Sequence, residues 1–159
     1  MRIGVTGHAD LGQPAAALVR TALSTALRPF AGPDLVGICC LCRGADQIFA
    51  HAVIEARGVL DVILPAADYR HRIVRDHEIQ TFDDLLGKAR RVRQAPFPSS
   101  GRPAYAFASQ MLLKECDMLF AVWDGTPSRR RGDTADVVRT AQQSGIEVHV
   151  IWPDHAIRR

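Results

Sequence analysis

The segment MLFAVWDGTPSRRRGDTADVVRTAQQSG, residues 118–145, joins an apolar run, a turn-rich loop and a helical pattern. The apolar run ends at Asp124 and is typical of a buried strand. Asp133 is a good N-cap for a helix that begins at Thr134, and Asp136 follows three residues later, as in a capping box. A loop that opens into a helix presents free backbone amides to an anion. The segment therefore predicts a strand–loop–helix unit that can hold a phosphate.

The rest of the chain repeats this alternation of short apolar runs and amphipathic helices. Strands that are apolar on both faces and separated by helices indicate a parallel sheet covered on both sides. Right-handed crossovers then give a doubly wound fold. We therefore predict an α/β, three-layer, doubly wound, mainly parallel sheet with helices on both faces (Rossmann-like). The predicted strands cover residues 2–7, 35–42, 59–65, 90–95 (a weak edge strand), 118–124 and 147–153; the predicted helices cover 13–27, 44–58, 75–89, 104–117 and 134–144.

Length, composition and charge narrow the class of protein. Hydrophobic residues make up 47% of the chain and charged residues 23%, as in an ordinary globular protein. The 159 residues favour one domain over 1–159. The net charge is only +3 and the one dense basic cluster is Arg129–Arg131, so nucleic acid is not the expected partner. No apolar run approaches the roughly 18 residues of a membrane span, and residues 1–8 lack the apolar region of a signal peptide. We expect a cytoplasmic protein with no membrane contact.

Three of the four cysteines fall within the predicted strand 35–42. A zinc site usually needs two separated pairs of ligands. Alternation along a strand would place Cys40 and Cys42 on one face and Cys39 on the other. We therefore predict buried free thiols and no metal. We also predict no resident cofactor. GVTGH is not a dinucleotide fingerprint, since the third glycine is absent and the helix begins later.

Ligands of doubly wound folds bind beyond the carboxyl ends of the strands, so the residues just after each strand are the candidates. Gly7 lets the backbone approach an anion, and His8 would either bind a phosphate or sugar or cap its loop. Gly44 opens a helix whose N-terminus faces the same edge. Arg43 matches phosphate oxygens, unless it pairs with an acid at the surface. Asp46 would either contact the ligand or satisfy amides in the first turn.

Two further loops complete the predicted site. In the segment after the third strand, Tyr69 would stack on a base and Arg72 would bind phosphate; solvated loop charges are the alternative. Asp124 stands at a strand end, where an acid commonly accepts ribose hydroxyls, and Gly125 follows it.

The predicted phosphate grip lies in the loop quoted first. Gly132, Thr134 and the neighbouring free amides would hold the phosphate, and Asp133 lies beside them. A purely structural capping role is the alternative for Asp133 and Asp136.

At these residues the chain resembles the Smf/DprA–LOG (SLOG) superfamily of Rossmann-like nucleotide-binding domains. The resemblance implies binding of a nucleotide or a nucleotide-derived ligand of the AMP or ADP-ribose type. Some relatives are enzymes, the LOG phosphoribohydrolases and the nucleoside deoxyribosyltransferases. The matching pieces span nearly the whole chain in order: GVTGH, RGAD, LP…Y, AVWDG and GDTADVVRTAQQSGIEV.

Two departures from the family pattern argue against catalysis. The enzymes carry a glutamate three residues after the motif threonine, where this chain has Val137. Asp136 is one residue earlier, about 100° around the helix. The second glycine of the motif is replaced by Asp133.

Three hypotheses follow. The first is a sensor or carrier that binds a nucleotide-derived ligand. The second is an N-glycosidic hydrolase acting on a nucleoside monophosphate through Asp124 or Asp136. The third is a structural domain that binds nothing. Relatives are usually dimers or larger, so we also expect a homodimer that buries the helix containing Tyr105, Phe107 and Met111.

Overall fold

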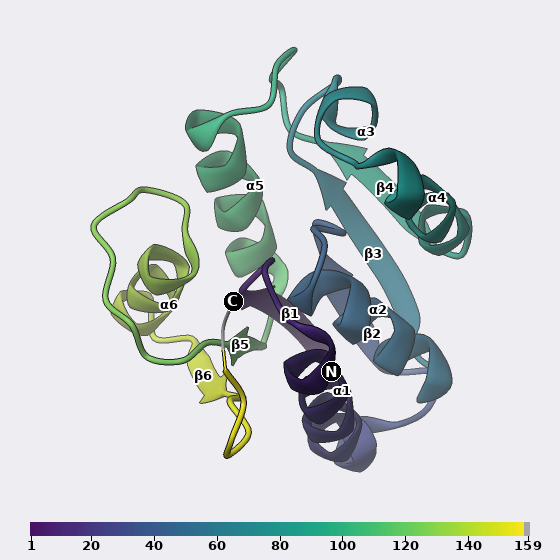
Figure 1. The fold of residues 1–159 in the computed structure, drawn as a ribbon, viewed down its shortest axis with the longest axis vertical. Coiled ribbons are helices and arrows are strands. Elements are labelled where there is room, and N and C mark those ends of the chain that lie inside the picture. Colours follow the sequence, from purple (N-terminus) through teal and green to yellow (C-terminus); the bar gives the residue numbers. More distant parts are fainter. Residues whose placement is uncertain (158–159) are drawn as a thin grey trace.

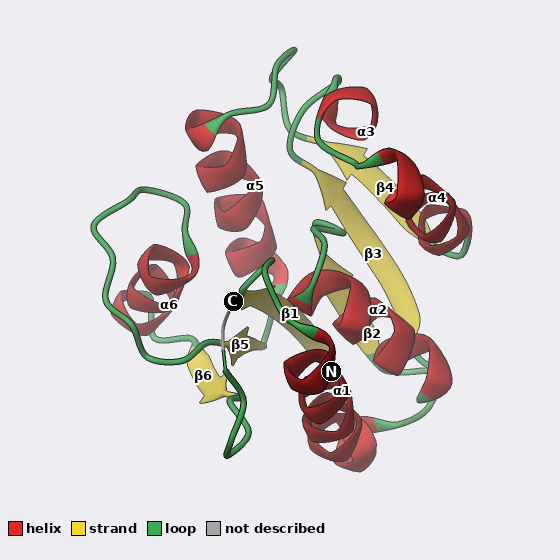
Figure 2. Cartoon of the chain, in the orientation of Figure 1, coloured by secondary structure: helices red, strands yellow, loops and turns green. Residues whose placement is uncertain are grey.

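The computed structural model describes residues 1–157, which form one six-stranded, fully parallel sheet in the order β4-β3-β2-β1-β5-β6 (Figures 1 and 2). Helices cover both faces, so the predicted three-layer, doubly wound α/β architecture is confirmed. The chain runs outward from β1 through β2 and β3 to β4, then returns to β5 on the other side of β1. The connections of β1 and β5 therefore leave the sheet in opposite directions, which is where such folds open a crevice.

The four inner strands are buried because their sequences are apolar on both faces. The two edge strands are more polar and more exposed, as the weak pattern of residues 90–95 predicts for β4. The inner strands are β1 (Arg2–Gly7), β2 (Val36–Cys39), β3 (Val59–Leu64) and β5 (Met118–Val122), and the edge strands are β4 (Arg91–Gln94) and β6 (Glu147–Val150).

The helices divide between the two faces (Figure 1). Pro14 and Pro103 stand in the first turns of α1 and α5, where a missing amide costs nothing. One face carries α1 (Gln13–Leu27), α2 (Ala45–Glu55) and α4 (Ile79–Gly87), and the other carries α5 (Arg102–Glu115) and α6 (Thr134–Gln143). Three short pieces complete the helices: η1 (Arg28–Phe30), α3 (Tyr69–Arg72) and η2 (Asp76–Glu78).

Each face of the sheet has its own apolar core. Phe49, Phe82 and Phe120 are fully buried on the α1–α2–α4 side. On the other side, α5 and α6 pack Leu112 and Val137 against the strands. These cores hold the amino ends of α2 and α6 at the carboxyl edge of the sheet.

The second strand is shorter than the sequence predicts. It ends at Cys39, and Leu41 takes a left-handed backbone conformation with φ 56°. Cys40 and Cys42 therefore lie in a loop at the carboxyl edge, and the expectation that they share one strand face is wrong. Cys39 is fully buried in the core, as expected. All four cysteines are free thiols.

Two further findings concern residues 1–157. None of their helices is long and apolar enough to span a membrane. Their histidines, cysteines and acids form no group of three or more that could hold a metal ion.

Candidate functional site

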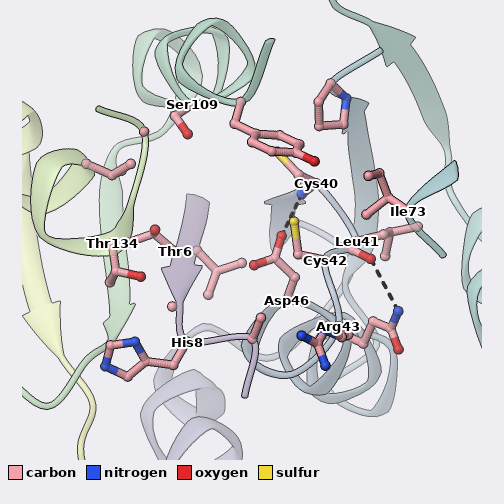
Figure 3. A pocket seen from close by; sticks show the side chains of 18 of the residues that line it. Thr6, His8, Cys40, Leu41, Cys42, Arg43, Asp46, Ile73, Ser109 and Thr134 are labelled. Carbon is pink, nitrogen blue, oxygen red and sulfur yellow. Dashed lines mark hydrogen bonds between the residues drawn. The ribbon is translucent and has the colours of Figure 1, made fainter. Parts of the chain in front are cut away.

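A cavity of about 310 Å³ lies at the carboxyl ends of β1, β2 and β3, beside α5 and the N-terminus of α6 (Figure 3). Its volume is at the lower end of the range for small-molecule sites, roughly 300–1,000 Å³. The fold thus brings together loops that are far apart in the sequence. Eight of the residues predicted to bind a ligand line this cavity: Gly7, His8, Arg43, Asp46, Tyr69, Gly132, Asp133 and Thr134.

The other four predicted residues are not part of the cavity lining. Gly44 lines a separate, more open groove. The side chain of Arg72 is 66% exposed and pairs with Asp68 at 3.5 Å. Gly125 is exposed in the loop after β5. Asp124 is held by His8.

His8 and Asp124 form a pair that joins the ends of β1 and β5. The His8 Nε2 atom is 3.0 Å from Asp124 Oδ1, and the ring meets Trp152 edge-on at 5.5 Å between centroids. Figure 3 shows the His8 ring directed away from the middle of the cavity. Partial burial would raise the pKa of Asp124, but hydrogen bonds from Thr126 and His8 outweigh it and lower the pKa to about 2. Both side chains are thus hydrogen-bonded to each other, and Asp124 also bonds the Thr126 amide of its own loop.

At Gly7 and Gly44 neighbouring parts of the chain lie so close that a side chain would not fit. A Cβ atom on Gly7 would lie 2.5 Å from the Ala45 Cβ. At Gly44, which has φ 76°, a Cβ would lie 2.6 Å from the carbonyl oxygens of His8 and Ala9. The Ala45 amide donates to the His8 carbonyl at 3.1 Å, so these glycines lock the start of α2 onto the end of β1.

Arg43 stands at the rim of the cavity and already has a partner. Its Nη2 atom is 2.7 Å from Asp10 Oδ1, and its side chain is 33% exposed. The ion pair with an acid at the surface, which the sequence offered as the alternative role of Arg43, is therefore present.

The N-terminus of α6 is capped from within. Asp133 Oδ1 accepts from the Asp136 amide at 3.0 Å, and Asp136 Oδ2 accepts from the Gly132 amide at 2.8 Å. Asp136 also pairs with Arg139. The Gly132 amide is therefore occupied. Within residues 1–157, the amides of Thr134 and Ala135 have no acceptor, so they remain for an anion.

Val137 contributes an inert side chain to the cavity. It is buried with Val138 and Ala141 on the inner face of α6 and lines the cavity itself. Asp136 is not part of the cavity lining; it borders a small pocket between α5 and α6.

Tyr69 belongs to the wall of the cavity. It is 3% exposed, its ring packs on Phe82 and Tyr105, and its hydroxyl donates to Cys42 Sγ at 3.1 Å. Burial raises the pKa of the Tyr69 phenol far above its ordinary value. The sequence placed this residue in a polar loop, but residues 69–72 form the short helix α3.

Sequence reasoning missed several residues that line the cavity. Cys40 and Cys42 do so because β2 ends early, which the apolar run 35–42 conceals. Tyr105 and Ser109 come from α5, whose register against the sheet no local pattern reveals. Thr6 lies within β1 and faces the same space (Figure 3).

Asp46 is the one acid buried deeply in the cavity wall. It is 5% exposed, and its Oδ2 accepts from the Cys40 amide at 2.9 Å. Burial raises the pKa of Asp46 to about 7, against the opposing effect of hydrogen bonds from the amides of Cys40 and Cys42.

Comparison with solved structures identifies relatives of this fold. DNA processing protein A (DprA) from Streptococcus pneumoniae aligns with a TM-score of 0.70 and 14% identity, over 94% of this chain and 49% of DprA. The chain therefore has a Rossmann-like fold. The protein TM1055 aligns with a TM-score of 0.58 and 16% identity, over 92% of this chain and 71% of TM1055. The chain spans about half the length of DprA. No protein-family model and no curated protein matches the sequence.

Proposed function

We propose that this protein binds a nucleotide or a nucleotide-derived ligand, of the AMP or ADP-ribose type, in the cavity at the carboxyl edge of its sheet. The ligand's phosphate would lie at the N-terminus of α6 and its sugar and base deeper in the cavity. Such a protein would act as a sensor or carrier.

One observation carries the proposal: the cavity opens onto a helix N-terminus that still has free amides. The Thr134 and Ala135 amides and the Thr134 side chain offer donors, and the positive end of the helix dipole favours an anion. Tyr69, Tyr105 and Leu112 also line the cavity, which suits a flat apolar group. A phosphate site and an apolar wall in one cavity match the two halves of a nucleotide.

The experiment is a thermal-shift and calorimetric screen of AMP, CMP, NAD and ADP-ribose. A ligand at a hundred times its Kd stabilises the fold by about 2.7 kcal/mol, which raises the Tm by about 5–10 °C in a chain of this size. Absence of binding by all four compounds would contradict the proposal.

A matched pair of variants locates the site. Thr134→Asp adds a negative charge where the phosphate is expected, and an acid in a first helical turn does not weaken the helix. We expect it to weaken nucleotide binding at least tenfold. Thr21→Asp adds the same charge on the exposed side of α1 and should leave the Kd unchanged. Equal losses in both variants would place the site elsewhere.

Hydrolysis of the N-glycosidic bond is the second candidate. Neither Asp124 nor Asp136 lines the cavity, and Val137 stands where related enzymes have glutamate, so these positions favour binding without cleavage. Asp46 alone keeps the alternative open, because a buried carboxyl with a pKa of about 7 is suited to acid–base chemistry. We expect no base release from AMP or CMP in long incubations with protein in excess. Release that disappears in Asp46→Asn would promote the hydrolase.

A further inference from the structure

The Asp46 carboxylate accepts hydrogen bonds from the amides of Cys40 and Cys42, and one of its oxygens is turned to the cavity. Asp46 is the second residue of α2, and the Cys40 amide holds its Oδ2 atom at 2.9 Å. In Figure 3 the other oxygen points into the open space between Thr6 and the cysteines. A buried oxygen that faces a cavity is satisfied by whatever enters it.

No cation in the described part of the chain pairs with this carboxylate. Arg43, the nearest cation in sequence, is held by Asp10 at 2.7 Å. The titratable groups around Asp46 are the Cys39, Cys40 and Cys42 thiols and the Tyr69 phenol. Burial raises the pKa of each of these well above neutrality, so they stay uncharged. The Tyr69 phenol already donates its hydrogen bond to Cys42 Sγ.

The other charged groups of the lining have partners of their own. Burial raises the pKa of Tyr105, on α5, so this phenol also stays neutral. The remaining pairs are His8 with Asp124, Asp10 with Arg43, Glu78 with His77, and Asp133 with the Asp136 amide. Around Asp46 the floor of the cavity therefore presents an acceptor that faces the cavity and has no cationic partner among the described residues.

A phosphate is disfavoured beside the ionised form of this carboxyl, because the two charges repel each other, whereas an N–H or O–H group can donate to it. We propose that Asp46 selects the ligand by accepting a hydrogen bond from an N–H or O–H group that the ligand carries at the end remote from its phosphate. This inference rests on the proposed function, and it sets the orientation of the ligand in the cavity. The phosphate lies at Thr134, and the donor-bearing end lies at Asp46.

Two parts of a nucleotide offer such a donor, the amino group of the base and the hydroxyls of the sugar. Four probes separate them: AMP, purine riboside 5′-monophosphate, which lacks the amino group, and the 2′-deoxy and 3′-deoxy forms of AMP. A hydrogen bond to a charged acceptor changes affinity by roughly ten- to a hundredfold. One of the three analogues should therefore bind about tenfold or more weakly than AMP.

The variant Asp46→Asn makes the test specific. The Cys40 amide needs an acceptor, so the side-chain oxygen of the introduced asparagine stays on Cys40 and its NH₂ group turns to the cavity. That change replaces an acceptor by a donor with little change of shape. AMP should lose tenfold or more in affinity, and the analogue that lacks the key donor should bind the variant as well as AMP does. Asp10→Asn removes the same charge at the cavity rim and should leave the AMP-to-analogue ratio as in wild type.

The pH dependence of AMP binding is a second test, and it can be measured on the wild-type protein. A donor on the ligand favours the ionised carboxylate, so AMP should bind wild type more tightly as pH rises from 6 to 8, relative to Asp46→Asn at each pH. The inference is overturned if all analogues bind like AMP, or if the discrimination survives in Asp46→Asn. If AMP, CMP, NAD and ADP-ribose all fail to bind, the proposed function fails and this inference with it.

Discussion

Replacing Asp46 by Asn should stabilise the free protein above neutral pH. In the fold, burial raises the pKa of this carboxyl from its ordinary value of 3.8 to about 7. The unfolded chain therefore releases this proton at lower pH than the fold does. A group whose pKa is raised by folding contributes its full stability at pH below 3.8, and that contribution is lost as pH rises to about 7. Asn does not titrate, so the variant avoids the loss.

The magnitude follows from the two pKa values. One pKa unit corresponds to about 1.36 kcal/mol, so the ionised carboxylate costs the fold about 4 kcal/mol above pH 7. The free energy of unfolding of Asp46→Asn relative to wild type should therefore rise by about 4 kcal/mol between pH 4 and pH 8. Urea unfolding at several pH values measures this difference, and all other titrating groups cancel in it.

Asp124→Asn is the control, because folding shifts the pKa of Asp124 in the opposite direction. Its pKa is lowered to about 2, so its contribution is present above pH 3.8 and is lost as pH falls toward 2. Asp124→Asn should be less stable than wild type by about 1–2 kcal/mol at neutral pH, and this deficit should shrink as pH falls from 3.8 toward 2. A flat difference between Asp46→Asn and wild type from pH 4 to pH 8 would refute the reasoning about the buried carboxyl.

Three further predictions concern the fold and its association. Gly44→Ala should lower the free energy of unfolding, measured with urea, by about 2 kcal/mol or more, because its Cβ would meet backbone carbonyl oxygens at 2.6 Å. Gly145→Ala is the control: Gly145 has φ 74° but open space around it, so this change should cost only about 1 kcal/mol. Asp61→Asn should destabilise the fold by about 2–3 kcal/mol, since this fully buried carboxylate holds Arg90 at 2.8 Å and Arg91 at 3.1 Å; a melting temperature equal to that of wild type would contradict this. Light scattering at micromolar concentration should give twice the 17.4 kDa mass of the chain, and Phe107→Asp, on the exposed side of α5, should give a monomer; a monomeric wild type would overturn the homodimer.

The fold could be predicted because its signal is local. Six apolar or edge-strand runs alternate with helices, and β1 and α1 have the bounds that the sequence predicts. Apolar residues on both strand faces require cover on both faces, and right-handed crossovers leave few topologies. The early end of β2 could not be predicted, because the left-handed Leu41 sits inside an unbroken apolar run.

Part of the candidate site could be predicted for the same reason. The rule that ligands bind beyond the strand ends selects loops that the fold does bring together, and eight of the predicted residues line one cavity. It does not tell which side chains are already engaged. His8 and Asp124 satisfy each other, and that partnership depends on a distance across the fold, whereas the bond from the Gly132 amide to Asp136 is a local contact at the helix N-terminus.

The engagement of these acids changes what the loop after β5 can do. An acid that pairs with a histidine or an arginine is held in place by that partner, which makes it less available to a substrate. Asp124 pairs with His8 and Asp136 pairs with Arg139, and both acids lie outside the cavity lining. Asp46 is the opposite case: its charge lacks a cationic partner among residues 1–157, and one of its oxygens faces the cavity. The residue that the sequence explained most simply, as an acid in a first helical turn, is therefore the one whose chemistry needs a ligand to complete it.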